Sequence, residues 1–158
     1  KNPGATNVLR LGGKFYAALV LLLDALKGAA PVAVAIGLGC TPLEQTLVLL
    51  AAMLGHIFPI YFSFQGGKGI ATFLGGLWVL SPTLGAVFVG TWLVVFAVAR
   101  ISALSALLAL LTTIAVAYWL SHSPLLFVLA ALLLWTHREN WRRLWSGQEK
   151  ALKGPKGT

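Results

Sequence analysis

The sequence has 158 residues, of which 58% are hydrophobic and 10% charged, and its formal net charge is +8. Soluble domains carry about 25% charged residues, so this chain has too little polar surface to cover a core against water, and an ordinary soluble domain is excluded. The lysines and arginines lie in short junctions between apolar segments, which is typical of membrane topology rather than of nucleic-acid binding, so no nucleic-acid partner is expected.

Six apolar segments follow one another along the chain, and we predict that each forms one helix of an all-α, polytopic transmembrane bundle. A helix needs about 20 apolar residues to cross the hydrocarbon of a bilayer, and the third and sixth segments are shorter than this. These two are either half-helices or they extend into their polar flanks. The six segments are Phe15–Leu38, Leu43–Phe62, Ile70–Leu80, Thr83–Ala99, Ile101–Leu120 and Leu125–Thr136.

The junctions between the segments indicate how the chain crosses the membrane. Three junctions, GCTP, SP and SHSP, contain no lysine or arginine, whereas Lys68 and Arg100 lie in the two between them. Six crossings place every loop lysine and arginine on one face, which is expected to be the cytoplasm, while a re-entrant third segment would put Arg100 outside. Residues 1–149 are therefore predicted to form an integral membrane domain, and residues 150–158 a flexible cytoplasmic tail.

Four polar clusters converge on this face, which favours a shared polar site over four ordinary interfacial loops. The clusters are NPGATNVLR, GHIFP running into QGGKG, ARISALS, and HREN. The side chains of interest are Thr6, Asn7 and Arg10 in the first, His56 and Lys68 in the second, Ser102 in the third, and His137, Arg138 and Asn140 in the fourth.

The stretch QGGKG predicts an anion-binding loop, for which phosphate is the most suitable ligand. Gly66, Gly67 and Gly69 admit conformations closed to other residues, so their N–H groups can point at one ligand. The next helix begins directly afterwards and adds its N-terminal dipole, and Lys68 supplies a full charge. Phe62 and Gly69 stand where a Walker A motif needs other residues, so nucleotide hydrolysis loses support. The alternative is a flexible turn with a lysine that reaches the interface.

Other titratable residues suggest supporting roles. His137 and Asn140 are three residues apart and share a face on a helix. His56 is expected to brace the glycine loop. Asp24 and Lys27 can pair within the first segment, either as a structural pair or as part of a relay. The sequence carries no metal-ligand spacing and no covalent-nucleophile motif, so no metal and no cofactor is expected.

Four stretches resemble the bacterial acyl-phosphate glycerol-3-phosphate acyltransferases, the PlsY family. They are NPGATNVLR, DALKG, GHIFPIYFSFQGGKGIAT and HRENWRRLWSGQE, and their order and spacing also match from Lys1 to about Glu149. The resemblance implies a seven-helix enzyme of the bacterial inner membrane with its site facing the cytoplasm. It implies transfer of a fatty acyl group from long-chain acyl phosphate to the 1-hydroxyl of sn-glycerol 3-phosphate, which yields lysophosphatidic acid and phosphate for phospholipid biosynthesis.

The same resemblance assigns roles to residues by their position in the motifs. The catalytic residues that it implies are Arg10, Lys68, Ser102, His137 and Asn140. The phosphate of the acceptor would be held by Gly66, Gly67, Lys68 and Gly69 with Thr6 and Asn7, supported by His56, Asp24, Lys27 and Arg138. Because an acyl phosphate is already activated, positioning and charge stabilisation would supply much of the acceleration.

Several details of the reaction remain expectations or alternatives. Either a substrate phosphate oxygen or His137 would accept the hydroxyl proton, since no carboxylate near the site is an obvious base. The acyl chain would lie between helices or in the membrane, where Gly75 and Gly76 allow close approach. Trp92 is expected, with other aromatic residues near segment ends, to lie at the membrane interface.

Two rival functions and one departure from the family pattern follow from the same residues. A small transporter or channel subunit for an anionic solute would use Lys68 and the Asp24–Lys27 pair as an ion path, although the outer half of the segments is almost wholly apolar. A non-catalytic assembly factor is the third reading. The family has a further N-terminal helix and a Gly-Ser just before the position of Lys1, so the 158-residue chain alone is expected to be poorly active.

Overall fold

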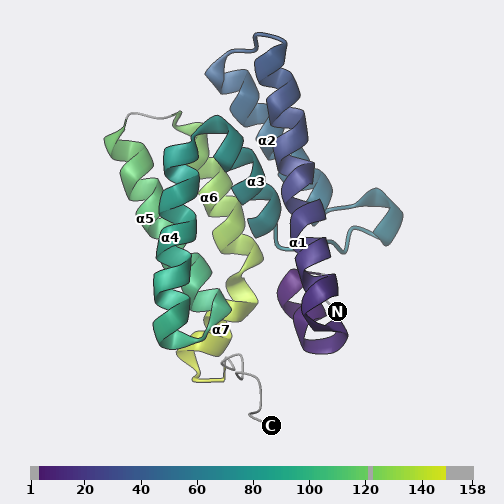
Figure 1. The fold of residues 1–158 in the computed structure, drawn as a ribbon, viewed down its shortest axis with the longest axis vertical. Helices are drawn as coiled ribbons and strands as arrows, with labels where there is room; N and C mark the ends of the chain where they lie inside the picture. Colours follow the sequence, from purple (N-terminus) through teal and green to yellow (C-terminus); the bar gives the residue numbers. More distant parts are fainter. Residues whose placement is uncertain (1–3, 121–122, 149–158) are drawn as a thin grey trace.

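The computed structural model describes residues 4–120 and 123–148, which fold into helices joined by short turns (Figure 1). The described residues contain no strand, so the all-α prediction is confirmed, and α1 to α6 correspond to the six predicted segments. The predicted tail, 150–158, lies outside the described residues. The elements are α1 (Ala5–Gly37), α2 (Pro42–Ile57), a 3₁₀ turn (Ile60–Phe62), α3 (Ile70–Leu80), α4 (Pro82–Ala99), α5 (Ser102–Trp119), α6 (Leu125–Thr136) and α7 (Arg138–Trp145).

The ends of the first two helices differ from the prediction for identifiable reasons. α1 begins at Ala5 rather than Phe15, because residues 5–12 form a helical piece of their own that bends away at Gly13, whose φ of 85° suits glycine. The second segment was predicted to continue to Phe62, but α2 ends at Ile57. Phe58 precedes Pro59 and has left the helical region, as residues before proline do. α7 was not predicted, because its residues are mostly polar.

The helices that begin on the side of the molecule opposite the polar clusters have strong sequence signals at their first residues. Thr41 caps α2 by accepting from the Glu44 backbone N–H, while the Glu44 carboxylate accepts from the Thr41 N–H. Ser81 caps α4 in a similar way. Both helices continue with proline at their first position, where its missing N–H costs nothing. These local rules explain why the first residues of both α2 and α4 match the prediction to one residue.

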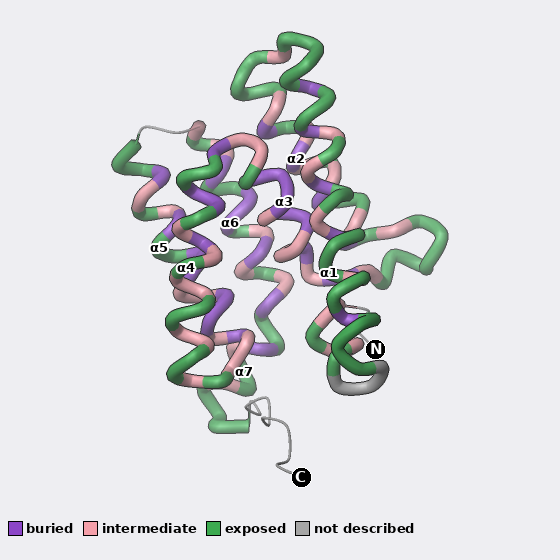
Figure 2. Tube along the Cα trace, in the orientation of Figure 1, coloured by how far each residue is buried: buried purple, intermediate pink, exposed green. Residues whose placement is uncertain are grey.

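The short helix α3 lies at the centre of the bundle and packs against α1, α2 and α4. Its Phe73 and Leu77 side chains are fully buried, and Figure 2 shows a buried stretch along the α3 backbone. α3 approaches α1 closely through glycine on both sides. A Cβ on Gly28 would lie 1.9 Å from the Thr72 carbonyl oxygen, and one on Gly75 would lie 2.0 Å from that of Ala25. Only residues without a side chain permit this spacing of the two backbones.

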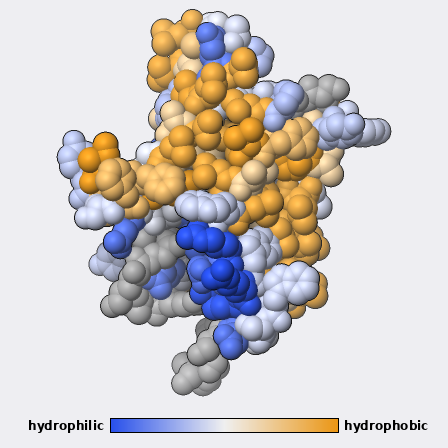
Figure 3. Space-filling view, turned by 180° about the vertical axis from the view of Figure 1, so that it is seen from behind, coloured by the Kyte–Doolittle hydropathy of each residue, from blue (hydrophilic) through white to orange (hydrophobic). Residues whose placement is uncertain are grey.

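The outer surface is apolar over most of its height, as a lipid-facing surface must be. Within residues 4–120 and 123–148, four helical stretches are long and apolar enough to cross a membrane, namely Gly13–Gly37, Pro42–Phe62, Pro82–Ala99 and Ser102–Trp119, while α3 and α6 are shorter. Large side chains point outward, for example Val98 with 84% of its surface exposed. Figure 3 shows an apolar band with hydrophilic surface below it. The start of α1, the α4–α5 turn and α7 share the lower end of the molecule in Figure 1, and the α1–α2 and α3–α4 turns lie at the upper end, as six crossings require.

Candidate active site

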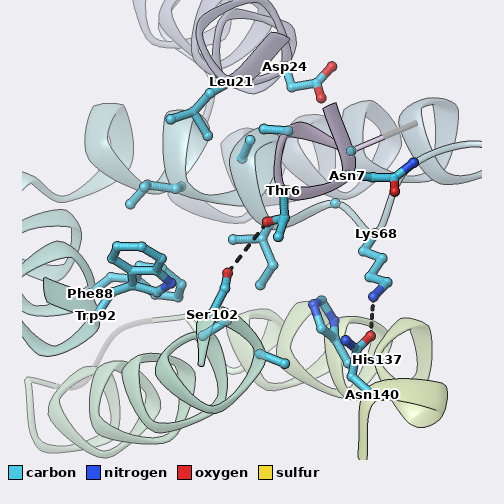
Figure 4. A pocket seen from close by; sticks show the side chains of 18 of the residues that line it. Thr6, Asn7, Leu21, Asp24, Lys68, Phe88, Trp92, Ser102, His137 and Asn140 are labelled. Atoms are coloured by element: carbon cyan, nitrogen blue, oxygen red, sulfur yellow. Dashed lines mark hydrogen bonds between the residues drawn. The ribbon is translucent and has the colours of Figure 1, made fainter. Parts of the chain in front are cut away.

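A cavity of about 550 Å³ opens where the start of α1, the glycine loop, α4, α5 and α7 meet. Its two ends differ in character (Figure 4). The polar end is lined by Thr6, Asn7, Lys68, Ser102, His137, Asn140 and Arg143. The apolar end is lined by Leu21, Leu74, Phe88, Val89, Trp92 and Leu93. The cavity thus matches a molecule with a charged head and an apolar tail.

Lys68 is fixed at the polar end by two contacts with the α6–α7 junction. Its Nζ donates to the Oδ1 of Asn140, and its carbonyl oxygen accepts from the Thr136 hydroxyl at 2.9 Å. Figure 4 shows Lys68 reaching across the cavity toward His137 and Asn140. Lys68 and Asn140 were predicted to belong to one site, and the structure brings them together. Thr136, which positions the lysine backbone, was not predicted, because a threonine at the end of an apolar helix carries no distinctive signal.

His137 has a defined tautomer and a lowered pKa. Its Nδ1 lies 2.8 Å from the carbonyl oxygen of Leu133, which can only accept, so Nδ1 carries the proton and Nε2 keeps a free electron pair. The residue is 7% exposed, and burial, only partly offset by the bond to the Leu133 carbonyl, lowers the pKa of His137 to about 4, with Lys68 adding to the effect. At neutral pH the imidazole is therefore uncharged.

The first helical turns of α1 and α5 face each other across the cavity mouth. The hydroxyl oxygens of Thr6 and Ser102 lie 3.5 Å apart, as the dashed line in Figure 4 marks, and Asn7 lines the cavity beside them. The two helices thus bring together two polar residues that lie in separate motifs of the sequence. Arg10 belongs to α1, but its side chain lies outside the described part of the molecule.

The glycine loop is arranged differently from the expected nest of three N–H groups. Gly66 and Gly67 donate their N–H groups to the carbonyl oxygens of Ile57 and His56 at 3.1 and 3.3 Å, so these donors hold the loop to α2. Gly69 precedes α3 with φ of 88°, a conformation that glycine favours. Lys68, Gly69 and Ile70 line the cavity, which places the start of α3 at the polar end. Lys68 and the start of α3, rather than Gly66 and Gly67, are therefore the part of the loop that lines the polar end.

A carboxylate that was expected to support the site also faces the cavity. Asp24 lines the cavity from α1, and its side chain is 11% exposed. It accepts from Lys27 Nζ at 2.8 Å, which confirms the predicted pair, and lies 3.5 Å from His56 Nδ1. His56 also lines the cavity. Sequence spacing paired Asp24 with Lys27, but only the crossing of α1 and α2 brings the histidine to it.

Arg138 and Lys27, like Gly66 and Gly67, are predicted site residues that do not line the cavity, whereas Arg143 and Trp92 line it without having been predicted. Arg138 stacks over the Trp135 ring at 4.4 Å and donates to the Trp135 carbonyl oxygen, so it belongs to the outer surface. Lys27 reaches the cavity only through Asp24. Arg143 lines the polar end from α7, and Trp92 lines the apolar end although it was expected at the membrane interface. Both were missed because their faces depend on how α4 and α7 pack.

Gly75 and Gly76 allow close approach, as expected, and the groups that approach them belong to α1 and α2. Gly75 packs against the Ala25 backbone of α1, and a Cβ on Gly76 would meet the Leu49 side chain of α2 at 2.3 Å. These glycines therefore serve helix packing. The apolar end of the cavity is lined mostly by α4 side chains, together with Leu21 of α1 and Leu74 of α3. Phe88 of α4 is also in edge contact with Phe73. Among the described residues, no group of three or more His, Cys, Asp or Glu side chains is arranged to hold a metal ion.

Comparisons with known proteins point to one family. Residues 1–147 match the family model described as glycerol-3-phosphate acyltransferase. A protein of that name from Idiomarina loihiensis is 45% identical over 154 residues, covering 96% of this chain and 79% of its own length. One from Thioalkalivibrio sulfidiphilus is 49% identical over 152 residues, covering 94% and 75%.

The same fold occurs in two crystal structures of PlsY, described as an integral membrane glycerol 3-phosphate acyltransferase. One is its glycerol 3-phosphate form and the other its lysophosphatidic acid form. Each is 35% identical to this chain with a TM-score of 0.91, and the match covers 96% of this chain and 78% or 80% of the solved one. At this identity and coverage, the backbone arrangement of the cavity is shared with a membrane enzyme.

Proposed function

Because the chain belongs to the glycerol-3-phosphate acyltransferase family, we propose that it transfers a fatty acyl group from a long-chain acyl phosphate to the 1-hydroxyl of sn-glycerol 3-phosphate. The products are lysophosphatidic acid and inorganic phosphate. The acceptor is supported by the names of the relatives and by the glycerol 3-phosphate form of the solved structure. The acyl phosphate donor is supported by the resemblance of the sequence motifs.

The observation that carries this proposal is the division of one cavity into a cationic end and an apolar end. Lys68 and Arg143 supply positive charge where two phosphate groups would meet. Trp92, Phe88 and Leu93 supply an apolar wall of the kind that a fatty chain needs. A site for two small soluble anions would not need the apolar end, and a site for a neutral lipid would not need the cationic end.

The main task of the protein in this reaction is to align two anionic substrates that repel each other. The 1-hydroxyl oxygen attacks the acyl carbonyl carbon, the bond from that carbon to the phosphate oxygen breaks, and the hydroxyl proton ends on the released phosphate. Lys68, fixed through Asn140 and Thr136, holds the phosphates and stabilises the negative charge that develops on the carbonyl oxygen. Ser102 and Thr6, at the cavity mouth, are placed to donate to the same anions.

The neutral His137 suits an orienting role better than that of a strong base. Its Nε2 carries an electron pair and can accept a hydrogen bond from the attacking hydroxyl, which aligns the oxygen lone pair with the carbonyl carbon. A group with a pKa of about 4 holds a proton poorly at neutral pH. A substrate phosphate oxygen, whose second pKa is near 6, is the better final acceptor. Of the two acceptors left open by the sequence, we therefore favour the phosphate.

The proposed reaction predicts phosphate release that depends on both substrates. The purified chain in detergent or nanodiscs is expected to release phosphate from palmitoyl phosphate when glycerol 3-phosphate is added, with one lysophosphatidic acid formed per phosphate. Palmitoyl-CoA should not replace palmitoyl phosphate. Binding of glycerol 3-phosphate without any acyl transfer would contradict the proposal and favour the transporter alternative.

The site is proposed to face the cytoplasm of a bacterial inner membrane, and cysteine labelling tests this. In a Cys40→Ala background, Gln65→Cys and Ser146→Cys are expected to react only with reagent on the cytoplasmic side, because both positions are on the lysine- and arginine-rich side of the predicted topology. Ser123→Cys should react only from outside. Labelling of Gln65→Cys and Ser146→Cys from opposite sides would contradict six crossings.

A further inference from the structure

Behind the glycine loop, three titratable side chains from α1 and α2 form a chain of contacts that the proposed chemistry does not use. Lys27 Nζ lies 2.8 Å from Asp24 Oδ1, and His56 Nδ1 lies 3.5 Å from the same oxygen. The Lys27 side chain is 57% exposed, whereas those of Asp24 and His56 are 11% and 8% exposed. The chain of contacts therefore runs from a partly exposed lysine to a buried imidazole.

The contact between Asp24 and His56 is looser than a well-formed hydrogen bond. The separation of 3.5 Å meets an ion-pair distance, but Nδ1 of His56 has no partner of hydrogen-bond geometry and is buried. An unsatisfied buried nitrogen is costly, so an N–H on Nδ1 gains from a negative charge close to it. The carboxylate next to Nδ1 is the group that orients it, because it attracts an N–H on that side of the ring.

The other edge of the His56 ring presses on the glycine loop. A Cβ built on Gly67 would lie 2.1 Å from His56 Nε2 and 2.8 Å from Cε1, so the ring lies directly against the Gly67 α-carbon. Gly67 has no positive φ, so an alanine fits its backbone conformation, and the ring is the obstacle. The loop N–H groups of Gly66 and Gly67 meanwhile bind carbonyl oxygens of Ile57 and His56 in the last turn of α2.

The residue after Gly67 is Lys68, the cation at the polar end of the cavity. Its side chain is held by Asn140 and its carbonyl oxygen by Thr136. The residue before it, Gly67, lies against the His56 ring. A carboxylate in a site for two anionic substrates opposes their binding unless its charge is compensated and put to use. Asp24 is the single carboxylate among the described residues that line this cavity, and Lys27 compensates it.

We propose that Asp24 and His56 are positioning residues for phosphate recognition, in which Asp24 orients the His56 imidazole and the ring edge sets the place of Gly67 and Lys68. Neither residue needs to touch a substrate. The group they serve is the phosphate of glycerol 3-phosphate, so this inference rests on the proposed function. A purely structural pair would affect both substrates and the folded state alike, whereas a positioning pair affects the acceptor first.

Single substitutions separate these two roles. Asp24→Asn keeps the size of the side chain, and His56→Gln keeps much of its bulk. Both are expected to raise KM for glycerol 3-phosphate about tenfold or more, since misplacement by about 1 Å costs up to a hundredfold. KM for palmitoyl phosphate and the thermal unfolding midpoint in nanodiscs should stay near the wild-type values. Equal changes in the KM of both substrates, or an unchanged KM for the acceptor, would overturn the proposal.

A pair of double variants tests the contact itself. Gly67→Ala is expected to lower kcat/KM for glycerol 3-phosphate at least tenfold, because the added methyl group meets the His56 ring. Combined with His56→Ala, which removes the ring, it should recover to the level of His56→Ala alone. Gly66→Ala is the matched control. Its methyl group would meet the backbone oxygen of His56 at 2.0 Å, which remains after His56→Ala, so this pair should show no recovery.

The outcomes are distinguishable from failure of the proposed function. Independent, multiplicative effects of Gly67→Ala and His56→Ala would overturn the positioning inference, as would recovery of the Gly66→Ala pair. Wild-type chain that transfers no acyl group in the same assay would instead contradict the function. A third outcome is that the wild type is active, Lys68→Ala loses activity and Asp24→Asn keeps the wild-type KM for glycerol 3-phosphate. This outcome would retain the function and reject the role of Asp24.

Discussion

Lys68→Ala is expected to lower kcat/KM for glycerol 3-phosphate by about 30- to 1,000-fold while the protein stays folded. The lysine is half-buried, held by Asn140 and Thr136, and supplies charge at the polar end of the cavity. Loss of one charged contact in a partly dry site removes about 2–4 kcal/mol of transition-state stabilisation. Initial rates at varied glycerol 3-phosphate, together with thermal unfolding of the same sample, measure both parts of this expectation.

Two control variants make the result specific to this lysine. Lys14→Ala removes an exposed lysine of α1 that does not line the cavity, so its kinetics should match the wild type within about twofold. Lys68→Arg keeps the charge but not the compact ammonium group that donates a hydrogen bond to Asn140 Oδ1. It should therefore recover part of the lost kcat/KM. If Lys68→Ala keeps wild-type kinetics, the phosphate-binding role of the loop is wrong.

His137→Ala is the second substitution with a large expected effect, a fall in kcat of about 100- to 10,000-fold. It removes the Nε2 electron pair that orients the attacking hydroxyl and the Nδ1–H bond that ties the ring to Leu133. Glu139→Gln is the matched control in the same motif, because Glu139 is exposed and pairs with Arg142 at 3.3 Å. It should leave kcat within about twofold of the wild type.

The pH dependence of His137 has a definite sign. Its native pKa is lowered to about 4, so the imidazole is neutral at pH 7 and gains a proton only as pH falls through about 4. Between its ordinary value of 6.5 and about 4, the unfolded chain binds a proton that the native chain does not, so this residue makes stability fall as pH falls through that window. NMR titration of histidine-labelled protein, assigned with His137→Gln, should show no ring titration near pH 6.5 for this residue. Titration there would contradict the orienting role.

Much of the molecule follows from local rules that act along the chain. The length of each apolar run, the caps at Thr41 and Ser81, and the prolines after them are local, so the bounds of α3 and α6 are matched and that of α4 is matched to one residue. The polar clusters that hold Lys68, Ser102, His137 and Asn140 were placed on one side by charge and segment parity, and the structure brings these four to one cavity. The resemblance to the acyltransferase family also rested on sequence alone, and it is confirmed.

Other features required the packing of helices that are distant in sequence. The Gly66 and Gly67 N–H groups were expected at a ligand, but the last turn of α2 takes both as donors, because its unpaired carbonyl oxygens lie beside them. Trp92 lines the cavity because of the rotation of α4 about its axis, which a pattern with no strong apolar face does not determine. Arg143 lines it because of the place that α7 takes beside the cavity.

The sequence by itself therefore determined the solvent of this protein, its six apolar helices, its family and most of the polar residues of its site, because length, charge and motif spacing act locally. Only the tertiary structure decided that His56 lies between Asp24 and Gly67, since the three come from α1, α2 and the loop before α3. Contacts of that kind depend on how closely helix backbones approach each other. Between α1 and α3 the spacing is set by Gly28 and Gly75, whose effect appears only when these two helices are in contact.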